Sequence, residues 1–504
     1  MKRFALTTAL AVALLSLPLT AQLGSPATAE AVANHVVTTT ADGNNGGCTP
    51  SLCTFRDAIT AAEADGGTVV VPAGHYTGTM LGANGVFSPD GEFTIKGAGA
   101  GKTIIDGNQL SRTFAFYGQI TVRGVTVTGG KAPLAGCSCG AGFEVRSGGA
   151  LTLVDSVVAG NTAGSSSGGG IDVDSNATAV LTNVVVSGNS ADDGAGIHVD
   201  PSMGQTGRLT MTNVTLFGNT ATGNGGGLYV EGTVTARKVT IGQNTANGAG
   251  GGVWVKAGAS VRFDESTLAG NGADNANGLY NAGASTAVRV RNTIIADSAA
   301  ADCAGSSTPV LTSEGHNLER GHTCAFTGEG DLRNKDPKIV SLKPAGGNGL
   351  PVFVLASTSP AVNRGDNPSC SSTDERGLPR PSGSRCDFGA YEYQFPGKAV
   401  VAFPKRTIRL SSATKGVLPV QCRNVVTDRC SVKANLVTTA KKPVLLGSVK
   451  GVVAAKKSGN LTITLNKAGA KLLKKKATVL VKGTSANRVG SKVAVKVAIT
   501  VLPR

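Results

Sequence analysis

Two short segments of the sequence carry acidic and imidazole side chains at matching places. Asp172 and Asp174 belong to the segment IDVD, and His198 and Asp200 belong to IHVD, which begins 26 residues later. Hydrolysis of a glycosidic bond needs two carboxyl groups about 5.5 Å or about 6.5–9.5 Å apart. Side chains on neighbouring strands of one sheet fall within these distances. The four residues are therefore catalytic candidates, provided that the two segments are neighbouring strands.

Later segments carry aromatic side chains at the position that His198 holds. The chain has one Trp and six Tyr, and three of these seven rings share that position. Aromatic rings beside carboxylates can contact sugar rings and hydrogen-bond their hydroxyls. The alternative is that the rings only shield an exposed sheet. The candidate glycan-binding residues of this face are Glu144, Tyr229, Glu231, Trp254 and Tyr280.

A different set of segments carries arginines. Four cations on one sheet could contact an acidic sugar, or they could form a solvated charge ladder with Asp264 and Glu265. The candidates of this second face are Arg237, Arg262, Arg289 and Arg291.

An Asn recurs at a nearly fixed interval and shows which elements must position these residues. Each follows a short apolar run such as VVAGN, and the separations are 28, 30, 25 and 27 residues. Asp297 holds the same place 26 residues further on, and Gly130 the place 31 residues before. A period of this size is typical of a solenoid. The repeated residues are Asn161, Asn189, Asn219, Asn244 and Asn271.

Each period contains three short segments that alternate apolar and polar residues, as β-strands do. Strands in equivalent places can pair one rung on, about 4.8 Å away. We therefore predict an all-β protein with a right-handed parallel β-helix of three short strands per rung. The Asn column should hydrogen-bond its own side-chain amides along the stack, a structural role.

The chain is predicted to divide into five parts. Lys2 and Arg3 precede an apolar run, and Ala27-Thr28-Ala29 fits a signal-peptide cleavage site, with a cut after Ala21 as the alternative. Helical spacing from Thr54 to Ala64 predicts a helix that caps the first rung. The predicted parts are a signal peptide at 1–29, an N-terminal cap at 30–66, the parallel β-helix at 67–300, C-terminal rungs and a cap at 301–397, and a small Lys-rich β-sandwich at 398–504.

The ten cysteines fall into couples that are close in the sequence. In an exported chain an even count indicates disulfides. Cys137 and Cys139 are separated by one residue, and a ring that tight is strained, so their pairing is left open. The other predicted disulfides are Cys48–Cys53, Cys303–Cys324, Cys370–Cys386 and Cys422–Cys430.

Charge is divided unevenly along the chain. Residues 398–504 contain 17 Lys, 6 Arg and the single acid Asp428, a net charge of +22, whereas the body without the signal peptide carries −8. A positive net charge of this size indicates a polyanionic partner such as a teichoic-type polymer, an acidic glycan or anionic lipid headgroups. We expect no nucleic-acid partner, because export separates the chain from it and Phe403 is the only aromatic residue of this segment.

Several motifs resemble those of bacterial surface proteins. CTFRDAI (Cys53–Ile59) resembles the CSLREA motif that precedes surface β-helices, although Phe55 and Asp57 depart from its consensus. The GGG-I/L-x-V and GN-T/S-A repeats resemble the pectate-lyase-like superfamily, and CDFGAYE (Cys386–Glu392) resembles the choice-of-anchor Q region. The basic segment resembles Lys-rich Ig-like modules that end some actinobacterial surface proteins. These resemblances imply architecture more than activity.

In the pectate-lyase-like superfamily the cleft usually lies on the sheet that here carries the arginines, and an Arg can act as a base toward an acidic sugar. The calcium-binding and catalytic pattern of that superfamily is absent from this sequence. The resemblance therefore implies the fold without carrying over a catalytic residue.

The residues together favour a secreted, cell-surface-associated β-helix that is a non-catalytic surface or glycan-contact module. The alternatives are a secreted polysaccharide lyase or glycoside hydrolase acting on an acidic glycan, and a purely structural spacer. No HExxH motif occurs, and we predict no metal and no cofactor. No second apolar stretch of membrane-spanning length follows the signal peptide, and we expect a monomer whose partner is a cell-wall polyanion or polysaccharide.

Overall fold

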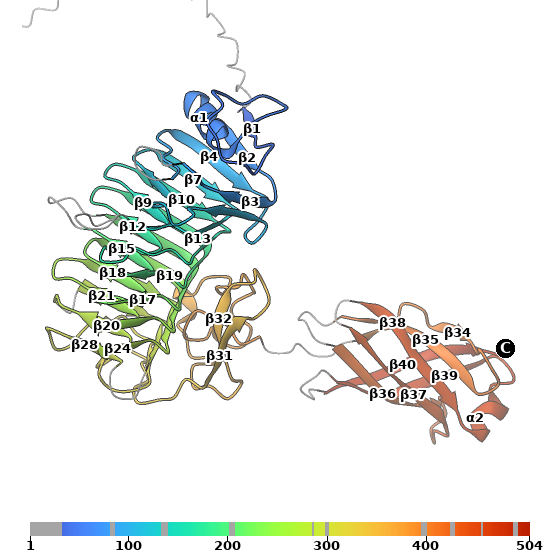
Figure 1. The fold of residues 1–504 in the computed structure, drawn as a ribbon. Coiled ribbons are helices and arrows are strands. Elements are labelled where there is room, and N and C mark those ends of the chain that lie inside the picture. Colours follow the sequence, from blue (N-terminus) through green and yellow to red (C-terminus); the bar gives the residue numbers. More distant parts are fainter. Residues whose placement is uncertain are drawn as a thin grey trace, which may run out of the picture.

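The computed structural model describes residues 33–80, 86–132, 140–200, 207–284, 287–297, 302–394, 401–423, 429–454, 457–486 and 492–503. The predicted signal peptide and the couple Cys137/Cys139 lie outside these residues. Figure 1 shows a stack of parallel rungs followed by a separate C-terminal sheet domain. The prediction of an all-β protein with a parallel β-helix and a C-terminal β domain is confirmed.

The first face of the solenoid is a parallel sheet built from the first segment of each period. Apolar residues alternate with Thr, Arg or Lys along its strands, so one side of the sheet faces the core and the other faces water. Its strands are β1 (Asn34–Val36), β2 (Thr68–Val71), β4 (Glu92–Gly97), β7 (Gln119–Arg123), β10 (Ala150–Val154), the first halves of β13 (Thr178–Ser187), β16 (Arg208–Phe217) and β19 (Thr233–Gly242), then β22 (Ser260–Asp264), β26 (Val288–Arg291) and β29 (Thr312–Ser313).

The second face continues from the first through a corner of residues with positive φ. Asn183 (φ 56°) and Asn213 (φ 55°) are non-glycine residues in the left-handed region, which Asn tolerates better than most residues. The strands of this face are β3 (Gly74–Thr77), β5 (Thr103–Asp106), β8 (Thr126–Thr128), β11 (Val157–Ala159), the second halves of β13, β16 and β19, then β23 (Thr267–Ala269), β27 (Ile294–Ala296) and β30 (Leu318–Glu319).

The third face is an eight-stranded parallel sheet built from the segments that follow the glycines. A Cβ on Gly196 would lie 2.3 Å from the carbonyl oxygen of Gly227, so the close stacking of rungs at this corner requires glycine. Its strands are β6 (Phe114–Phe116), β9 (Phe143–Val145), β12 (Ile171–Val173), β15 (Ile197–Val199), β18 (Leu228–Val230), β21 (Val253–Val255), β25 (Leu279–Asn281) and β28 (Cys303–Gly305). Four shorter strands pair between the second and third faces: β14 (Ser190–Ala191), β17 (Thr220–Ala221), β20 (Thr245–Ala249) and β24 (Gly272–Asn275).

A single apolar core fills the solenoid. The inward residues of the third face are fully buried and lie above one another. At the N-terminal end, helix α1 (Phe55–Asp65) closes the core with Phe55, whose ring lies 4.9 Å from that of Phe87. Thr54 and Asp57 form a capping box at the start of the helix. The predicted capping helix is therefore present.

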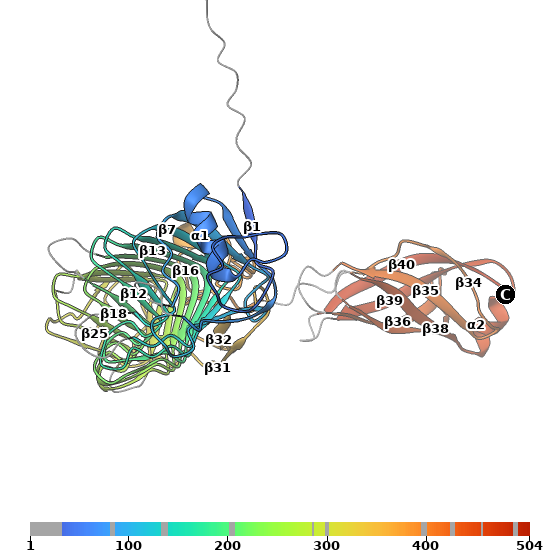
Figure 2. The same ribbon diagram turned by 45° about the horizontal axis from the view of Figure 1, so that its top comes forward.

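Residues 337–394, which we call the strap, fold back along the second face. They contain β31 (Ile339–Pro344), β32 (Pro351–Leu355) and the 3-10 turn η3 (Asn367–Ser369). Figures 1 and 2 both show β31 and β32 beside the rungs. Phe388 and Val352 of the strap share a buried cluster with Ile294 and Leu318 of the rungs. The strap therefore covers one side of the solenoid.

The C-terminal domain is one curled sheet around its own core. Its strand order is β33-β35-β38-β37-β36-β39-β40-β34, and a bridge between Leu410 and Gly416 brings β34 beside β35. Its elements are β33 (Val401–Ala402), β34 (Thr407–Arg409), β35 (Lys415–Cys422), β36 (Arg429–Thr438), β37 (Leu445–Ala454), β38 (Ser458–Leu465), α2 (Lys467–Leu472), β39 (Ala477–Ala486) and β40 (Lys492–Leu502).

Four of the predicted disulfides are present, namely Cys48–Cys53, Cys303–Cys324, Cys370–Cys386 and Cys422–Cys430. Each closes a loop of at most 21 residues. Within the described ranges, no helix is long and apolar enough to cross a membrane.

Candidate functional site

The candidate glycan face lies on the outer side of the third sheet, where one residue from each strand joins a column. Parallel pairing in register places each residue directly beside its counterpart on the next rung. The column, which we call the third-face column, consists of Glu144, Asp172, His198, Tyr229, Trp254 and Tyr280.

Asp172 and His198 form a buried pair within this column. The imidazole Nδ1 of His198 lies 2.7 Å from Oδ1 of Asp172, and the two residues are 3% and 0% exposed. Burial alone would favour a neutral ring, but the charge and hydrogen bond of Asp172 raise the pKa of His198 overall. The His198 imidazole is therefore a buried partner of Asp172, and this contact favours its protonated form.

Glu144 is neutralised by two arginines. Oε2 of Glu144 lies 2.7 Å from Nε of Arg112 and 3.3 Å from Nη2 of Arg146. Burial raises the pKa of Glu144, and the two guanidinium groups oppose that effect. Sequence reasoning missed Arg112, because it precedes β6 outside the repeated segments. The only signal in the sequence is a lone Arg just before the apolar run Phe114–Phe116, in a chain with only 16% charged residues.

A second column of charged side chains runs beside the first. Asp174 is half-buried, and its burial, followed by the charges of Asp172, Glu144 and Asp200, raises its pKa to about 8. Glu231 of the same column forms an ion pair, because its Oε1 lies 2.5 Å from Nζ of the exposed Lys256. The predicted acids are thus near one another, and Asp174 carries a proton at neutral pH.

The aromatic residues stack on each other rather than lying flat on the surface. The rings of Tyr229 and Trp254 are 4.3 Å apart and 10° from parallel, and Tyr280 follows with its centroid 6.4 Å from that of Trp254. Ring faces that meet each other cannot also meet a sugar, so edges and the Tyr229 hydroxyl remain for contact. The rung after Tyr280 carries Ala304, a small residue, so this end of the stack is the least crowded.

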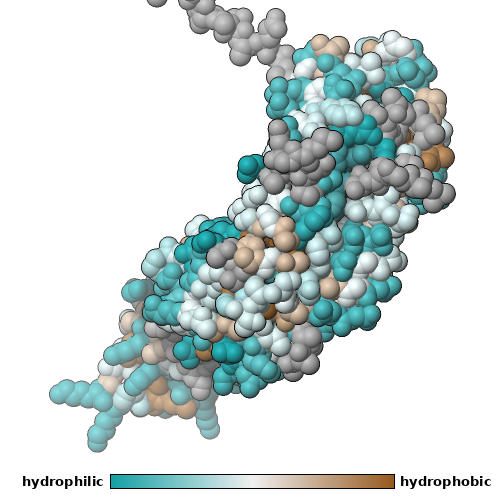
Figure 3. Space-filling view, turned by 90° about the vertical axis from the view of Figure 1, so that its left-hand side faces the viewer, coloured by the Kyte–Doolittle hydropathy of each residue, from teal (hydrophilic) through white to brown (hydrophobic). Residues whose placement is uncertain are grey.

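The expectation that the third-face column is open to solvent is only partly met. Asp172, His198 and Glu144 are buried, whereas the three aromatic residues are half-buried. Figure 3 views the molecule from the side of Figure 1 on which β28 lies and shows a surface that is mostly hydrophilic or neutral, with hydrophobic residues in small areas.

The arginines of the second candidate face are paired with acids. Arg237 contacts Glu265 at 2.9 Å and Asp264 at 3.2 Å, and Arg291 lies 3.5 Å from Asp264. Arg262 contacts both Asp264 (2.9 Å) and Glu314 (2.6 Å), and Arg289 lies 3.5 Å from Glu314. The arginines thus pair with the acids that the charge-ladder alternative named, but Asp264 and Glu265 are buried and not solvated.

Another group of buried charges fastens the strap to the solenoid. Arg380 is fully buried and lies 3.0 Å from Glu265 of the rungs and 3.0 Å from Glu392 of the strap. Glu375 accepts hydrogen bonds from Thr240 (2.5 Å) and Thr215 (3.0 Å), and burial raises its pKa well above the ordinary value. Residues 373–381 (TDERGLPRP), which include Glu375 and Arg380, therefore dock the strap on the rungs.

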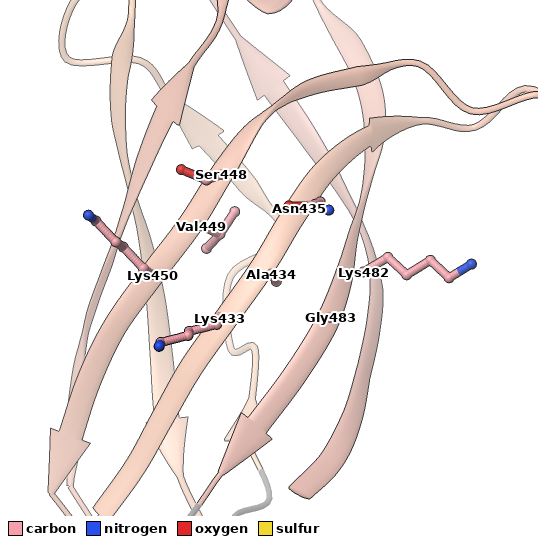
Figure 4. Close-up of a pocket in the computed structure, with 8 residues that line it drawn as sticks. All are labelled: Lys433, Ala434, Asn435, Ser448, Val449, Lys450, Lys482 and Gly483. Carbon is pink, nitrogen blue, oxygen red and sulfur yellow. The ribbon is translucent and has the colours of Figure 1, made fainter.

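The C-terminal domain has a basic pocket on the outer side of its sheet. The volume of this pocket is about 320 Å³. Figure 4 shows Lys433, Lys450 and Lys482 extending away from the strands. Lys433 and Lys450 are directly opposite each other on β36 and β37, and Lys482 is opposite Lys496 on β39 and β40. We call these four residues the lysine face. Asn435 and Ser448 lie between them.

No group of three or more His, Cys, Asp or Glu side chains is arranged to hold a metal ion in the part of the chain that the structure describes.

Comparison with solved structures finds likenesses at low identity. The A-module of the mannuronan C-5 epimerase AlgE4 of Azotobacter vinelandii has a TM-score of 0.29 and 16% identity, over 55% of this chain and 92% of that chain. The A-module of mannuronan C-5 epimerase AlgE6 of the same organism has a TM-score of 0.28 and 18% identity, over 56% and 91%. ORF18 of Geobacillus virus E2 has a TM-score of 0.23 and 10% identity, over 88% and 72%.

No curated protein matches the sequence. A family model described as a right handed beta helix region matches residues 115–295, so the central rungs are those of a right-handed β-helix.

Proposed function

We propose that this protein is a secreted, cell-envelope-associated β-helix that acts as a non-catalytic surface module, with its C-terminal domain bound to anionic envelope polymers. The lysine face is the observation that carries the proposal. Like charges directly opposite each other on neighbouring strands destabilise a sheet. Residues 398–504 contain no acid except Asp428, so this repulsion has almost no internal compensation. A bound polymer with repeated negative charges would compensate this repulsion between lysines.

The body of the protein supports a contact role rather than catalysis. His198 is buried against Asp172, the arginines of the first sheet are matched by acids, and the aromatic rings occupy each other's faces. What remains accessible on the third face is a row of ring edges beside Glu231 and Lys256. Such a row suits weak contact with a polysaccharide.

Retention of the full mature chain on purified cell wall tests the proposal. The variant K433Q/K450Q/K482Q should bind at least several-fold more weakly, because three of the four charges that face the polymer are removed. Binding of the unaltered protein should also fall steeply between 0.1 M and 1 M salt, as the screening length shrinks from about 10 Å to about 3 Å.

The matched control is K96Q/K102Q/K335Q, which removes three exposed lysines from the solenoid and changes the net charge equally. Retention that survives 1 M salt, or equal weakening by both triple variants, would contradict binding through the lysine face.

A hydrolase or lyase acting on an acidic glycan is the second candidate. Its support is Asp174, a carboxyl group that is protonated at neutral pH and lies close to Asp172 and Asp200. A protonated acid near an ionised one is the pairing that glycoside hydrolysis uses. If the protein degrades an acidic polysaccharide, Asp174→Asn should abolish the activity and Asp155→Asn, at a surface corner, should leave it intact. Binding without degradation, weakened by Trp254→Ala and kept by Trp254→Phe, is the result expected for a contact module.

A further inference from the structure

Three large apolar side chains are exposed at one end of the C-terminal domain. Val444 is 53% exposed, Leu445 50% and Leu472 47%. Leu445 begins β37 and Leu472 ends α2, and the two elements are tied together at this end. Asn466, the N-cap of α2, donates from Nδ2 to the carbonyl of Leu445 at 2.8 Å and from its backbone N–H to the carbonyl of Leu446 at 2.9 Å.

The same end carries a dense group of lysines. The turn between β36 and β37 and the chain from α2 to β39 both lie here, because β38 ends where β37 begins and β39 begins where β40 ends. All of these lysines are exposed. The three apolar residues and this group form what we call the basic tip, whose lysines are Lys441, Lys442, Lys467, Lys471, Lys474, Lys475 and Lys476.

The basic tip points away from the connection to the solenoid. The chain enters the domain at β33, which pairs with Gln421 and Cys422 at the end of β35, whereas the start of β35 at Lys415 pairs with Thr464 next to α2. Figure 1 shows α2 at the end of the domain farthest from the rungs. The tip is therefore free to meet an extended surface.

We propose that the basic tip docks on an anionic lipid surface, with Val444, Leu445 and Leu472 entering the headgroup boundary and the surrounding lysines contacting lipid phosphates. Apolar side chains ringed by cations gain from both the acyl boundary and the negative surface potential. A polymer of charges would attract the lysines but would leave the three apolar groups in water. A second copy of the chain would place seven lysines against seven others, which disfavours self-association through this end.

Vesicle co-sedimentation of the full mature chain tests the proposal. The protein should bind vesicles that mix phosphatidylglycerol with phosphatidylcholine and should not bind phosphatidylcholine alone. V444S/L445S/L472S keeps every charge and should weaken binding at least tenfold. V340S/V417S/V452S removes three apolar side chains that are exposed elsewhere and should leave binding unchanged.

Retention on purified cell wall separates this inference from the polymer proposal. V444S/L445S/L472S should be retained as well as the unaltered protein, because the lysine face is intact. Failure of the unaltered protein to bind anionic vesicles would overturn the lipid proposal and leave the polymer proposal standing. Equal vesicle binding by V444S/L445S/L472S and the unaltered protein would also overturn it, since charge alone would then account for the interaction.

A spectroscopic measurement reports insertion directly. Trp254 is the only Trp of the chain, so Leu445→Trp in a Trp254→Phe background places the single indole at the tip. Its emission should shift to the blue on addition of anionic vesicles. An unchanged emission maximum with bound protein would show that the tip stays in water and would overturn the inference.

Discussion

The buried Asn ladder ends in a carboxylate. In each rung the side-chain Nδ2 donates to Oδ1 of the next ladder residue and to a backbone carbonyl, as Asn271 does to Asp297 (2.7 Å) and Ile241 (3.1 Å). Oδ2 of Asp297 has no hydrogen-bond partner among the described residues. The next carbonyl in this series is that of Leu268, which pairs in register with Ile241. A protonated Asp297 could donate to it.

We predict that Asp297→Asn stabilises the protein, and more so at high pH. Burial, followed by the nearby charge of Asp302, raises the pKa of Asp297 from 3.8 to about 7. A raised acid pKa means that the folded state holds the proton longer, so stability is lost as pH rises from about 4 through 7. Asn cannot ionise and brings a donor for Leu268. We expect a gain of ~1–3 kcal/mol at pH 8 and a smaller one at pH 5, measured by denaturant unfolding.

The control is the exposed Asp274→Asn, which should leave the pH profile unchanged. Other buried acids with raised pKa values, Asp174 and Asp387, titrate in the same range. Only the difference between Asp297→Asn and the unaltered protein therefore isolates this group. If Asp297→Asn raised the free energy of unfolding equally at pH 5 and pH 8, ionisation of Asp297 would not be what destabilises the ladder.

Residue spacing predicted which side chains share a column but not how exposed they are. The register of Asp172, His198 and Tyr229 follows directly from a fixed repeat, because equivalent positions stack. Glu144 of the same column is buried against Arg112, which lies outside the repeat and has no periodic signal. Periodicity identifies neighbours along the solenoid and says nothing about what lies over them.

At the scale of the elements, the ladder joins rungs through side chains as well as backbone. Asn219 accepts from the side chain (3.0 Å) and the backbone N–H (3.1 Å) of Asn189, and donates to Asn244 (2.9 Å) and Val186 (3.1 Å). All of these bonds are buried. Each turn of the second face is thereby tied to the rungs on either side of it.

Replacing Asn219 with Leu should lower the stability of the solenoid far more than replacing exposed Thr235 with Leu. The first change leaves the backbone N–H and one side-chain N–H of Asn189 buried without an acceptor, at ~1–3 kcal/mol for each group. Thermal melting followed by circular dichroism measures the difference. Equal melting temperatures for the two variants would mean that the ladder adds nothing to stability.

The elements of the solenoid could be predicted from sequence more completely than those of the C-terminal domain. A repeated pattern reports each strand of the solenoid several times, whereas each strand of the C-terminal domain occurs once in the sequence. Helix α2 ends at Leu472, and the Lys474–Lys476 run forms the turn that leads into β39. The strap was not foreseen because its contacts join residues more than 100 positions apart.

At the scale of the whole molecule, the acidic solenoid and the basic domain differ in whether their charged side chains are paired. In the solenoid, arginines and acids occur in matched sets, as around Asp264 and Glu314. In the C-terminal domain, cations accumulate on the lysine face and the basic tip with no acid beside them. The composition alone predicted this division, and the structure adds that the unmatched cations gather on two separate surfaces. One surface suits a polymer and the other suits a lipid boundary.

The strap also decides how a pulling force would enter the molecule. If the C-terminal domain is held at the envelope and the solenoid is dragged away from it, tension arrives through the end of the strap, near Glu392. There, Arg380 links Glu392 to Glu265 in the middle of the rungs, and the strap's apolar side chains lie along the second face. The load is therefore spread in shear over several strands, and the terminal rung is not peeled away bond by bond. The strap works as a brace that lets the stacked rungs bear tension as a single body.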